Sequence, residues 1–168
     1  MQETFCVELE QYMKFNSSHF VVYKGFRESL HGHNYKVSVR LYADKINESG
    51  YVLDFDIIKE VGNDVCNKLK HVILLPKLNQ FIKITEVESN IEVRVIEDGS
   101  YFSFPKSDTN VIEVEQISAE CLSKYITNQI ISELKLKHNI DAKTNFTEIQ
   151  IKVYEDINKC AIYNLKLR

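Results

Sequence analysis

The chain has 168 residues, of which 44% are hydrophobic and 27% are charged, with only five glycines and two prolines. This composition is typical of one folded domain and excludes a disordered or low-complexity chain. A net charge of −3, together with the lack of an apolar run of about 18 residues, argues against binding to nucleic acid and against a membrane span.

The first half of the chain predicts two strands followed by a helix. Apolar and polar residues alternate over 5–15 and again over 31–43, with the period of two that a half-buried strand shows. A turn-like segment over 44–50 follows the second strand. Residues 54–69 carry apolar side chains at helical spacing, with acidic residues in the first turn, and predict a helix.

The segment 77–111 predicts a small β-excursion inserted between the two helices. Residues 91–96 and 101–104 flank the pair Asp98-Gly99, which is typical of a tight hairpin turn. We therefore expect an inserted β-hairpin here.

The remainder of the chain predicts a second helix and a closing hairpin. Residues 118–138 have a buried face at helical spacing, with Ser118 as a plausible N-cap. Residues 146–155 and 160–167 are predicted strands joined by a short loop. Antiparallel hairpins with two helices predict an α+β fold, in which one domain over 1–168 carries both helices on one face of a single sheet.

Three histidines carry most of the chemical information. The alternation over 31–43 places His31 and His33 on the same face as the apolar stripe, where they can converge on one ion, and His19 could supply a third nitrogen. Three neutral imidazoles around Zn²⁺ leave one coordination position open, which is the catalytic arrangement. The alternative is that a histidine pair in a strand serves packing or lies on the surface.

Three further residues could take part in chemistry at this site. Glu155 ends an apolar stripe, where a carboxylate needs a partner: either a basic side chain, or a ligand with two parallel N–H donors such as the edge of a pterin or guanine. Glu28 and His71 are either solvated surface residues or a general base and a general acid.

The cysteines are widely scattered and form no CxxC pair. They predict reduced, small apolar fillers, and with no signal-peptide pattern at the start we expect a cytoplasmic protein. The four are Cys6, Cys66, Cys121 and Cys160.

Several short segments together carry a family resemblance. They are Ser18-His19-Phe20, His31-Gly32-His33-Asn34-Tyr35, Gly50-Tyr51-Val52-Leu53-Asp54-Phe55 with Ile58-Lys59, His71, Ser118-Ala119-Glu120 and Val153-Tyr154-Glu155. In this order they resemble the 6-pyruvoyl tetrahydropterin synthase family, which includes the 6-carboxytetrahydropterin synthases.

The resemblance implies the tunnelling fold, a four-stranded antiparallel sheet with two helices on one face. It also implies a homohexamer, a dimer of trimers, with active sites between subunits. By the same resemblance, zinc is the expected cofactor, with Mg²⁺ as a further candidate ion, and the substrate is a pterin. The implied zinc ligands are His19, His31 and His33, and the implied pterin contacts are Glu155, Glu120 and Ser118.

The sequence departs from the family pattern at two catalytic positions. The family's synthases place a nucleophilic cysteine just before the His-Gly-His run, where this protein offers Glu28. The aspartate that normally precedes the catalytic histidine is Lys70, ahead of His71. A glutamate in place of the cysteine resembles a variant type of apicomplexan parasites and some bacteria, which makes 6-hydroxymethyl-7,8-dihydropterin for folate synthesis.

We therefore expect a zinc-dependent lyase that cleaves a carbon–carbon bond in the side chain of 7,8-dihydroneopterin or its triphosphate, with Glu28 as base and His71 as a candidate acid. Two alternatives stay open. One is true 6-pyruvoyl tetrahydropterin synthesis with triphosphate loss, and the other is a non-catalytic pterin-binding protein.

Overall fold

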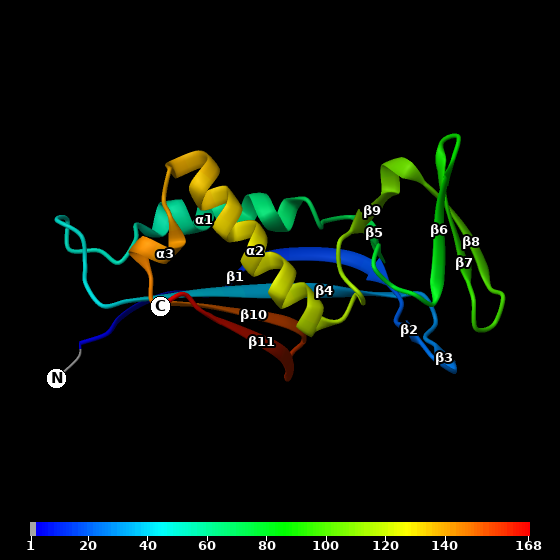
Figure 1. The fold of residues 1–168 in the computed structure, drawn as a ribbon, viewed down its shortest axis with the longest axis horizontal. Helices are drawn as coiled ribbons and strands as arrows, with labels where there is room; N and C mark the ends of the chain where they lie inside the picture. The colour runs from blue at the N-terminus through cyan, green and yellow to red at the C-terminus, as the bar shows by residue number, and fades with distance from the viewer. Residues whose placement is uncertain (1–2) are drawn as a thin grey trace.

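The computed structural model describes residues 3–168, and its main sheet has six strands in the order β11-β10-β4-β1-β5-β9 (Figure 1). The neighbours from β11 to β1 pair antiparallel, as predicted, whereas β5 and β9 extend the sheet in parallel. The expectation of only four strands is therefore corrected. The six strands are β1 (Phe5–His19), β4 (His31–Ala43), β5 (Val72–Pro76), β9 (Thr109–Ile112), β10 (Glu148–Asp156) and β11 (Lys159–Lys166).

Two long helices, α1 (Phe55–Asn67) and α2 (Ala119–His138), cover one face of this sheet, as predicted (Figure 1). Asp54 caps α1 by accepting a hydrogen bond from Asp56 N, and Ser118 caps α2 in the same way from Cys121 N. The inward residues of both helices pack on the apolar stripes of β1, β4 and β10. A short helix, α3 (Ala142–Asn145), was not predicted.

A bulge in β1 leaves the apolar side chains before and after it on the same face of the sheet. The pairing passes from Leu9 opposite Val39 to Met13 opposite Val37, so β1 contains extra residues around Gln11, whose φ is 50°. Because the shift is an even number of residues, the apolar side chains on both sides of the bulge face the helices. The end of β1 therefore delivers His19 to that same face.

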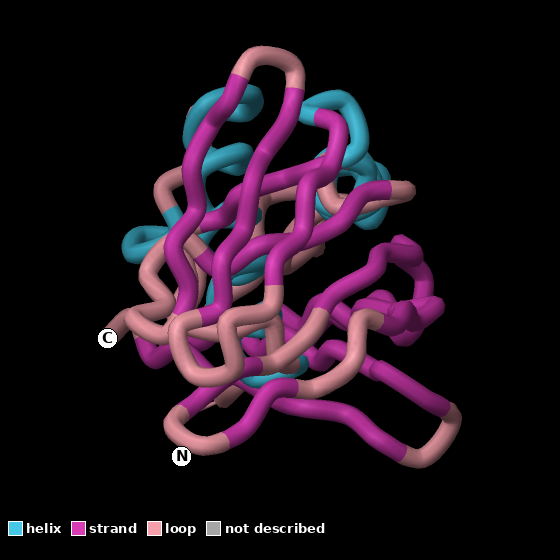
Figure 2. Tube along the Cα trace, turned by 90° about the vertical axis from the view of Figure 1, so that its right-hand side faces the viewer, coloured by secondary structure: helices cyan, strands magenta, loops and turns pink. Residues whose placement is uncertain are grey.

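The insert, residues 77–111, is larger than the predicted hairpin. The expected pair is present as β7 (Asn90–Val95) and β8 (Tyr101–Pro105), but β6 (Ile82–Val87) adds a third antiparallel strand. Figure 2 shows these strands in front of the rest of the molecule. They form a second small core with Phe20 and Val22, which come directly after β1.

Three short elements remain. β2 (Val22–Tyr23) and β3 (Phe26–Arg27) pair with each other between the first histidine and β4, and a 3-10 turn, η1 (Lys106–Asp108), precedes β9. Among residues 3–168, no helix is both long and apolar enough to cross a membrane.

Candidate active site

The three predicted imidazoles meet at one end of the β1–β4 pair. His19 lies directly opposite His31 in the antiparallel register, and His33 follows two residues later on the same face. One ring nitrogen from each histidine lies within 4.8 Å of the others. The strand periodicity that predicts this convergence is therefore realised in three dimensions.

The backbone fixes which nitrogen of two of these rings points into the site. The Nδ1 of His19 lies 2.6 Å from the carbonyl oxygen of Ile117, and the Nδ1 of His31 lies 2.8 Å from that of Ser29. A carbonyl only accepts, so each Nδ1 carries a proton, and in the neutral ring Nε2 presents a lone pair.

The unpaired nitrogens fit a metal ion. The Nε2 atoms of His19 and His33 are buried without a hydrogen-bond partner among the described residues. Burial, followed by the proximity of His31, lowers the pKa of His19 to about 4, so its ring is neutral at pH 7. Neutral imidazoles with free lone pairs suit Zn²⁺ and related transition ions.

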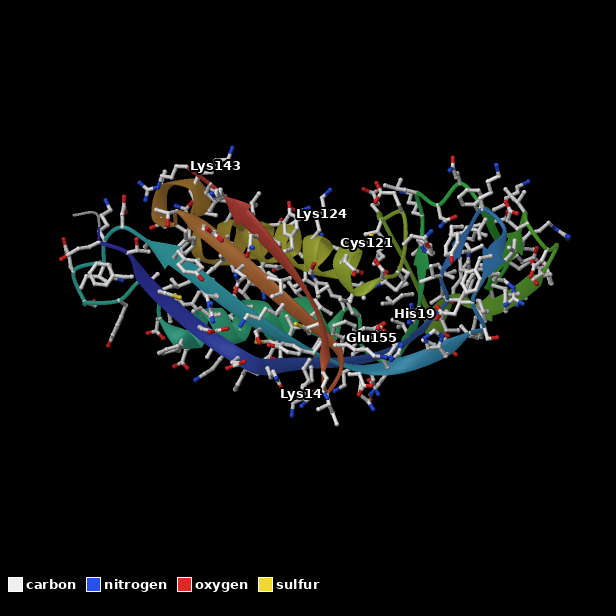
Figure 3. The ribbon with its side chains drawn as sticks, turned by 90° about the horizontal axis from the view of Figure 1, so that it is seen from below. Lys14, His19, Cys121, Lys124, Lys143 and Glu155 are labelled. Atoms are coloured by element: carbon white, nitrogen blue, oxygen red, sulfur yellow. The ribbon has the colours of Figure 1, made fainter. Side chains whose placement is uncertain are left out.

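The carboxylate of Glu155 lies beside these nitrogens. Its Oε1 is 3.4 Å from the Nε2 of His33 and 3.9 Å from that of His19 (Figure 3). No lysine or arginine of the described residues pairs with Glu155, which removes the more ordinary explanation for a carboxylate at the end of an apolar stripe. With 28% of its side chain exposed, the carboxylate is available to a ligand.

Glu28 lies beside His31, a third member of the same group of histidines. Its Oε1 lies 3.8 Å from the Nε2 of His31, and its Oε2 accepts a hydrogen bond from the backbone N–H of Val21 at 3.2 Å. The backbone N–H of Glu28 donates in turn to the carbonyl of Val21 at 2.9 Å. The loop thus holds this carboxylate next to the imidazoles through contacts with the backbone of Val21.

A cleft of about 490 Å³ unites these groups. All the predicted site residues line it except His71. Its lining residues are His19, Val21, Glu28, His31, His33, Ser118, Ala119, Glu120, Glu155, Asn158, Lys159, Cys160 and Ala161.

Within the single chain, His71 does not reach this cleft. It lines a neighbouring hollow of about 450 Å³ with Asn16, Asn34 and Asp108. Its backbone has a φ of 61°, and its N–H donates to the carbonyl of Asn16 at 2.7 Å. The hollow also touches His33, so the two cavities adjoin each other there.

The β10–β11 hairpin supplies cleft residues that were not predicted from the sequence. Asn158, Lys159 and Cys160 all line the cleft. Their position three to five residues after Glu155, across a tight hairpin, was the only signal that could have found them. The cysteines are all free, but Cys6 and Cys160 are exposed, so the prediction of apolar fillers is wrong for these two.

Comparison with known proteins agrees with this geometry. The profile of the 6-pyruvoyl tetrahydropterin synthase family matches residues 8–166. A Methanocaldococcus jannaschii protein with the provisional name 6-carboxy-5,6,7,8-tetrahydropterin synthase is 28% identical over 151 residues, which cover 90% of this chain and 89% of that protein.

Solved structures are similar over nearly the whole length. The crystal structure of Plasmodium vivax 6-pyruvoyl tetrahydropterin synthase has a TM-score of 0.89 and 37% identity, covering 98% of this chain and 99% of that one. The Plasmodium falciparum enzyme has a TM-score of 0.88 and 37% identity, covering 97% and 98%. These likenesses confirm the tunnelling fold, and the chain belongs to the 6-pyruvoyl tetrahydropterin synthase family of enzymes.

Proposed function

We propose that this protein is a zinc-dependent pterin lyase that converts 7,8-dihydroneopterin, or its triphosphate, to 6-hydroxymethyl-7,8-dihydropterin for folate biosynthesis. The observation that carries the proposal is the position of Glu28, whose carboxylate lies 3.8 Å from His31 inside the histidine cleft. No cysteine is present between Cys6 and Cys66, so the loop offers a carboxylate base only.

Glu155 is suited to hold the pterin. Two parallel N–H groups on the ring edge match the two oxygens of a carboxylate, as in an arginine–carboxylate pair. His19, His31 and His33 would hold the metal ion, which when bound supplies Lewis-acid polarisation of the oxygens on the substrate's tail. The ring would then lie with its tail toward Glu28.

Glu28 acts as the base. It removes the proton from the hydroxyl on the second carbon of the substrate's tail, and the bond between the first and second carbons breaks. The second carbon leaves as part of an aldehyde, and the electron pair passes to the first carbon, where the ring C=N bond stabilises it. Protonation of the first carbon, by Glu28 returning its proton or by His71, completes the hydroxymethyl product.

A relative supports a glutamate in this role. Two further structures of the P. vivax enzyme carry an alanine or a cysteine in place of a glutamate that is described there as a catalytic residue. Both are 37% identical to this chain over 98% of its length.

The same relatives favour a second candidate function. They are named 6-pyruvoyl tetrahydropterin synthases. In this alternative, Glu28 would remove a proton from a carbon of the substrate's tail instead of from a hydroxyl. If the base selects the route, Glu28→Cys shifts the output toward the pyruvoyl compound, because a thiolate with a reference pKa of about 8.5 is a stronger base than a carboxylate at about 4.3. An unchanged product ratio would contradict this idea.

We also propose that the enzyme is a homohexamer in which a neighbouring copy supplies His71 to the cleft. The single chain keeps His71 in a separate hollow from Glu28, which is the arrangement expected if the acid comes from another subunit. Mass measurement by light scattering tests the assembly, and a monomer with full activity would contradict it.

The test of function is product identification by mass spectrometry. Zinc-loaded protein is incubated with 7,8-dihydroneopterin and, separately, with its triphosphate. We expect 6-hydroxymethyl-7,8-dihydropterin from the native protein and none from Glu28→Ala, whereas Glu48→Ala, in an exposed loop, keeps the activity. Formation of the pyruvoyl product alone refutes the proposal.

A further inference from the structure

Residues 20–30, which include Glu28 and are called the arm below, lie outside the main sheet. Between His19 and His31 the only regular structure is the two-stranded β2–β3 hairpin, which pairs with itself and with no strand of the six-stranded sheet. A short hairpin of this kind is not stable alone. Its position must therefore be set by whatever packs against it.

The start of the arm is held by the insert and by the segment that follows it. The side chain of Gln116 donates to the carbonyl of Val22 at 2.5 Å and accepts from its N–H at 3.4 Å. Asn79 donates to the same carbonyl at 3.1 Å. Phe20, just before, stacks on Phe102 of β8 with ring centroids 5.1 Å apart.

The end of the arm is held by the turn between β7 and β8. The backbone N–H of Gly25 donates to Glu97 at 3.0 Å, and the Nε of Arg27 donates to Asp98 at 2.7 Å. Asp98 is itself oriented, because its other oxygen accepts the N–H of Ser100 at 2.9 Å. In Figure 1 this turn of the insert lies next to β3.

Arg27 connects this turn to the base. Its Nη1 donates to the backbone carbonyl of Glu28 at 3.2 Å, while its guanidinium also lies 5.8 Å from the centre of the Phe102 ring. One side chain thus joins the carboxylate of Asp98, an aromatic ring of the insert and the backbone of Glu28. A planar guanidinium with several fixed donors is well suited to such a junction.

We propose that Asp98 and Arg27 are a positioning pair for Glu28, so that the insert fixes the base relative to the histidines. This inference rests on the proposed function only in taking Glu28 as the base. Neither residue lines the cleft, so neither touches the substrate. Their effect passes through the backbone of Glu28 and its contact with Val21.

The pair is partly exposed, with 26% of the Arg27 side chain and 41% of the Asp98 side chain accessible. An ion pair of this kind contributes little to stability, so its loss leaves the fold intact. It does free the arm, and misplacing a catalytic group by about 1 Å costs up to about a hundredfold in rate. Glu155, the proposed pterin contact, lies on β10, so we expect loss of the Arg27–Asp98 pair to leave pterin binding unchanged.

The first experiment compares Asp98→Asn with Glu86→Gln. The control removes an ion pair with Lys106 on the same insert, away from the arm. We expect Asp98→Asn to lower kcat about tenfold with little change in KM and in bound zinc. Its melting temperature should equal that of the control. Asp98→Glu, which keeps the carboxylate, should recover part of the lost kcat. A kcat equal to that of the control, or a loss confined to KM, overturns the proposal.

A second measurement separates this inference from the proposed function. Amide hydrogen exchange at Val21 and Glu28 reports the loop directly, and we expect it to be faster in Asp98→Asn than in Glu86→Gln whatever reaction the protein catalyses. Equal protection in the two variants refutes the positioning pair. By contrast, a native protein that turns over no pterin refutes the function and leaves this comparison valid.

The effects of substitutions at Asp98 and at Glu28 on the rate must also be coupled. If Asp98 acts through Glu28, Asp98→Asn has no further effect on the residual rate of Glu28→Gln, whereas independent contributions multiply. Multiplying losses in the double variant would count against the proposal.

Discussion

The orientation of His19 depends on one backbone carbonyl. Ile117 precedes the cap of α2, and its carbonyl oxygen accepts a hydrogen bond from the Nδ1 of His19, the last residue of β1. The Nε2 of His19, which would bind an ion, is thereby already presented to the site, which lowers the cost of assembling it. His33 has no such constraint and lies instead beside Glu155.

Removing one imidazole should remove the metal. We expect His19→Ala and His33→Ala to purify with far less zinc than the native protein, measured by elemental analysis after dialysis, because two nitrogens hold a divalent ion much more weakly than three. His138→Ala is the matched control, since that histidine lies on α2 beside Glu60. Full zinc content in both site variants would contradict the assignment.

The carboxylate of Glu155 should govern pterin affinity. A hydrogen bond to a charged group is worth about 1.5–3 kcal/mol, so Glu155→Gln should weaken binding of 6-hydroxymethyl-7,8-dihydropterin about tenfold or more. Fluorescence titration measures this, with Glu148→Gln at the start of the same strand as control. Equal affinities would exclude Glu155 as the pterin anchor.

The side chains whose face of the sheet follows from the alternation along a strand could be predicted from the sequence. Parity placed His31 and His33 on the helix face, because a period of two leaves no choice of side once the apolar stripe is buried. Glu155 also lines the cleft, as its parity predicts, although the pairing of β10 with β11 shifts register between Tyr154 and Asp156. The separate hollow of His71 could not be foreseen, since it depends on how β5 joins β1 after a left-handed residue. Cys160 was missed for a similar reason: its place in the cleft follows from a turn.

At the scale of elements, the N-terminus of α2 serves both helix and cleft. Ser118 lines the cleft, and its hydroxyl accepts the N–H of Cys121 at 3.3 Å. The cap therefore accounts for this serine without any ligand, and the pterin contact stays a separate prediction.

The free energy of unfolding tests the cap separately from the predicted pterin contact. Ser118→Ala should lower the free energy of unfolding by about 1 kcal/mol, the usual cost of losing a cap, whereas Ser118→Asp retains the acceptor and the stability. Urea denaturation gives both values. If alanine and aspartate are equally stable, the cap contributes nothing.

Long elements with clear periodicity were predicted well, and short or non-local ones were not. The bounds of β4 agree with the alternation over 31–43, and α2 begins at its predicted cap. The strand β5 is a short apolar run whose partners are distant in sequence, so periodicity alone could not identify it as a parallel strand. With four residues, α3 is too short to show a helical period.

At the scale of the whole molecule, the sheet face opposite the helices carries a charged network across three strands. Glu8 on β1 accepts hydrogen bonds from Arg40 on β4, one of them at 2.9 Å, and from Lys152 on β10 at 3.0 Å. Partial burial raises the pKa of the Glu8 carboxyl, but the hydrogen bonds from Arg40 and Lys152 outweigh it and hold the pKa below its ordinary value.

This network predicts a loss of stability in acid. Since the folded pKa of Glu8 lies below the unfolded one, the unfolded protein binds more protons, and the stabilisation that is present above the ordinary pKa of 4.5 is lost as the pH falls below it. We expect the Tm of Glu8→Gln to be lower at neutral pH and to fall less steeply in acid. Glu3→Gln, an exposed position before β1, should follow the native curve.

The three histidines and Glu28, the proposed base, are held by different hydrophobic cores. The histidines end long strands in the large core, whereas Glu28 is tethered through Arg27 and Val22 to a small core of its own. On gentle heating, the smaller unit should loosen first. Catalysis would then fade several degrees before the protein releases its ion or loses its bulk circular dichroism, leaving a folded, metallated and inert species.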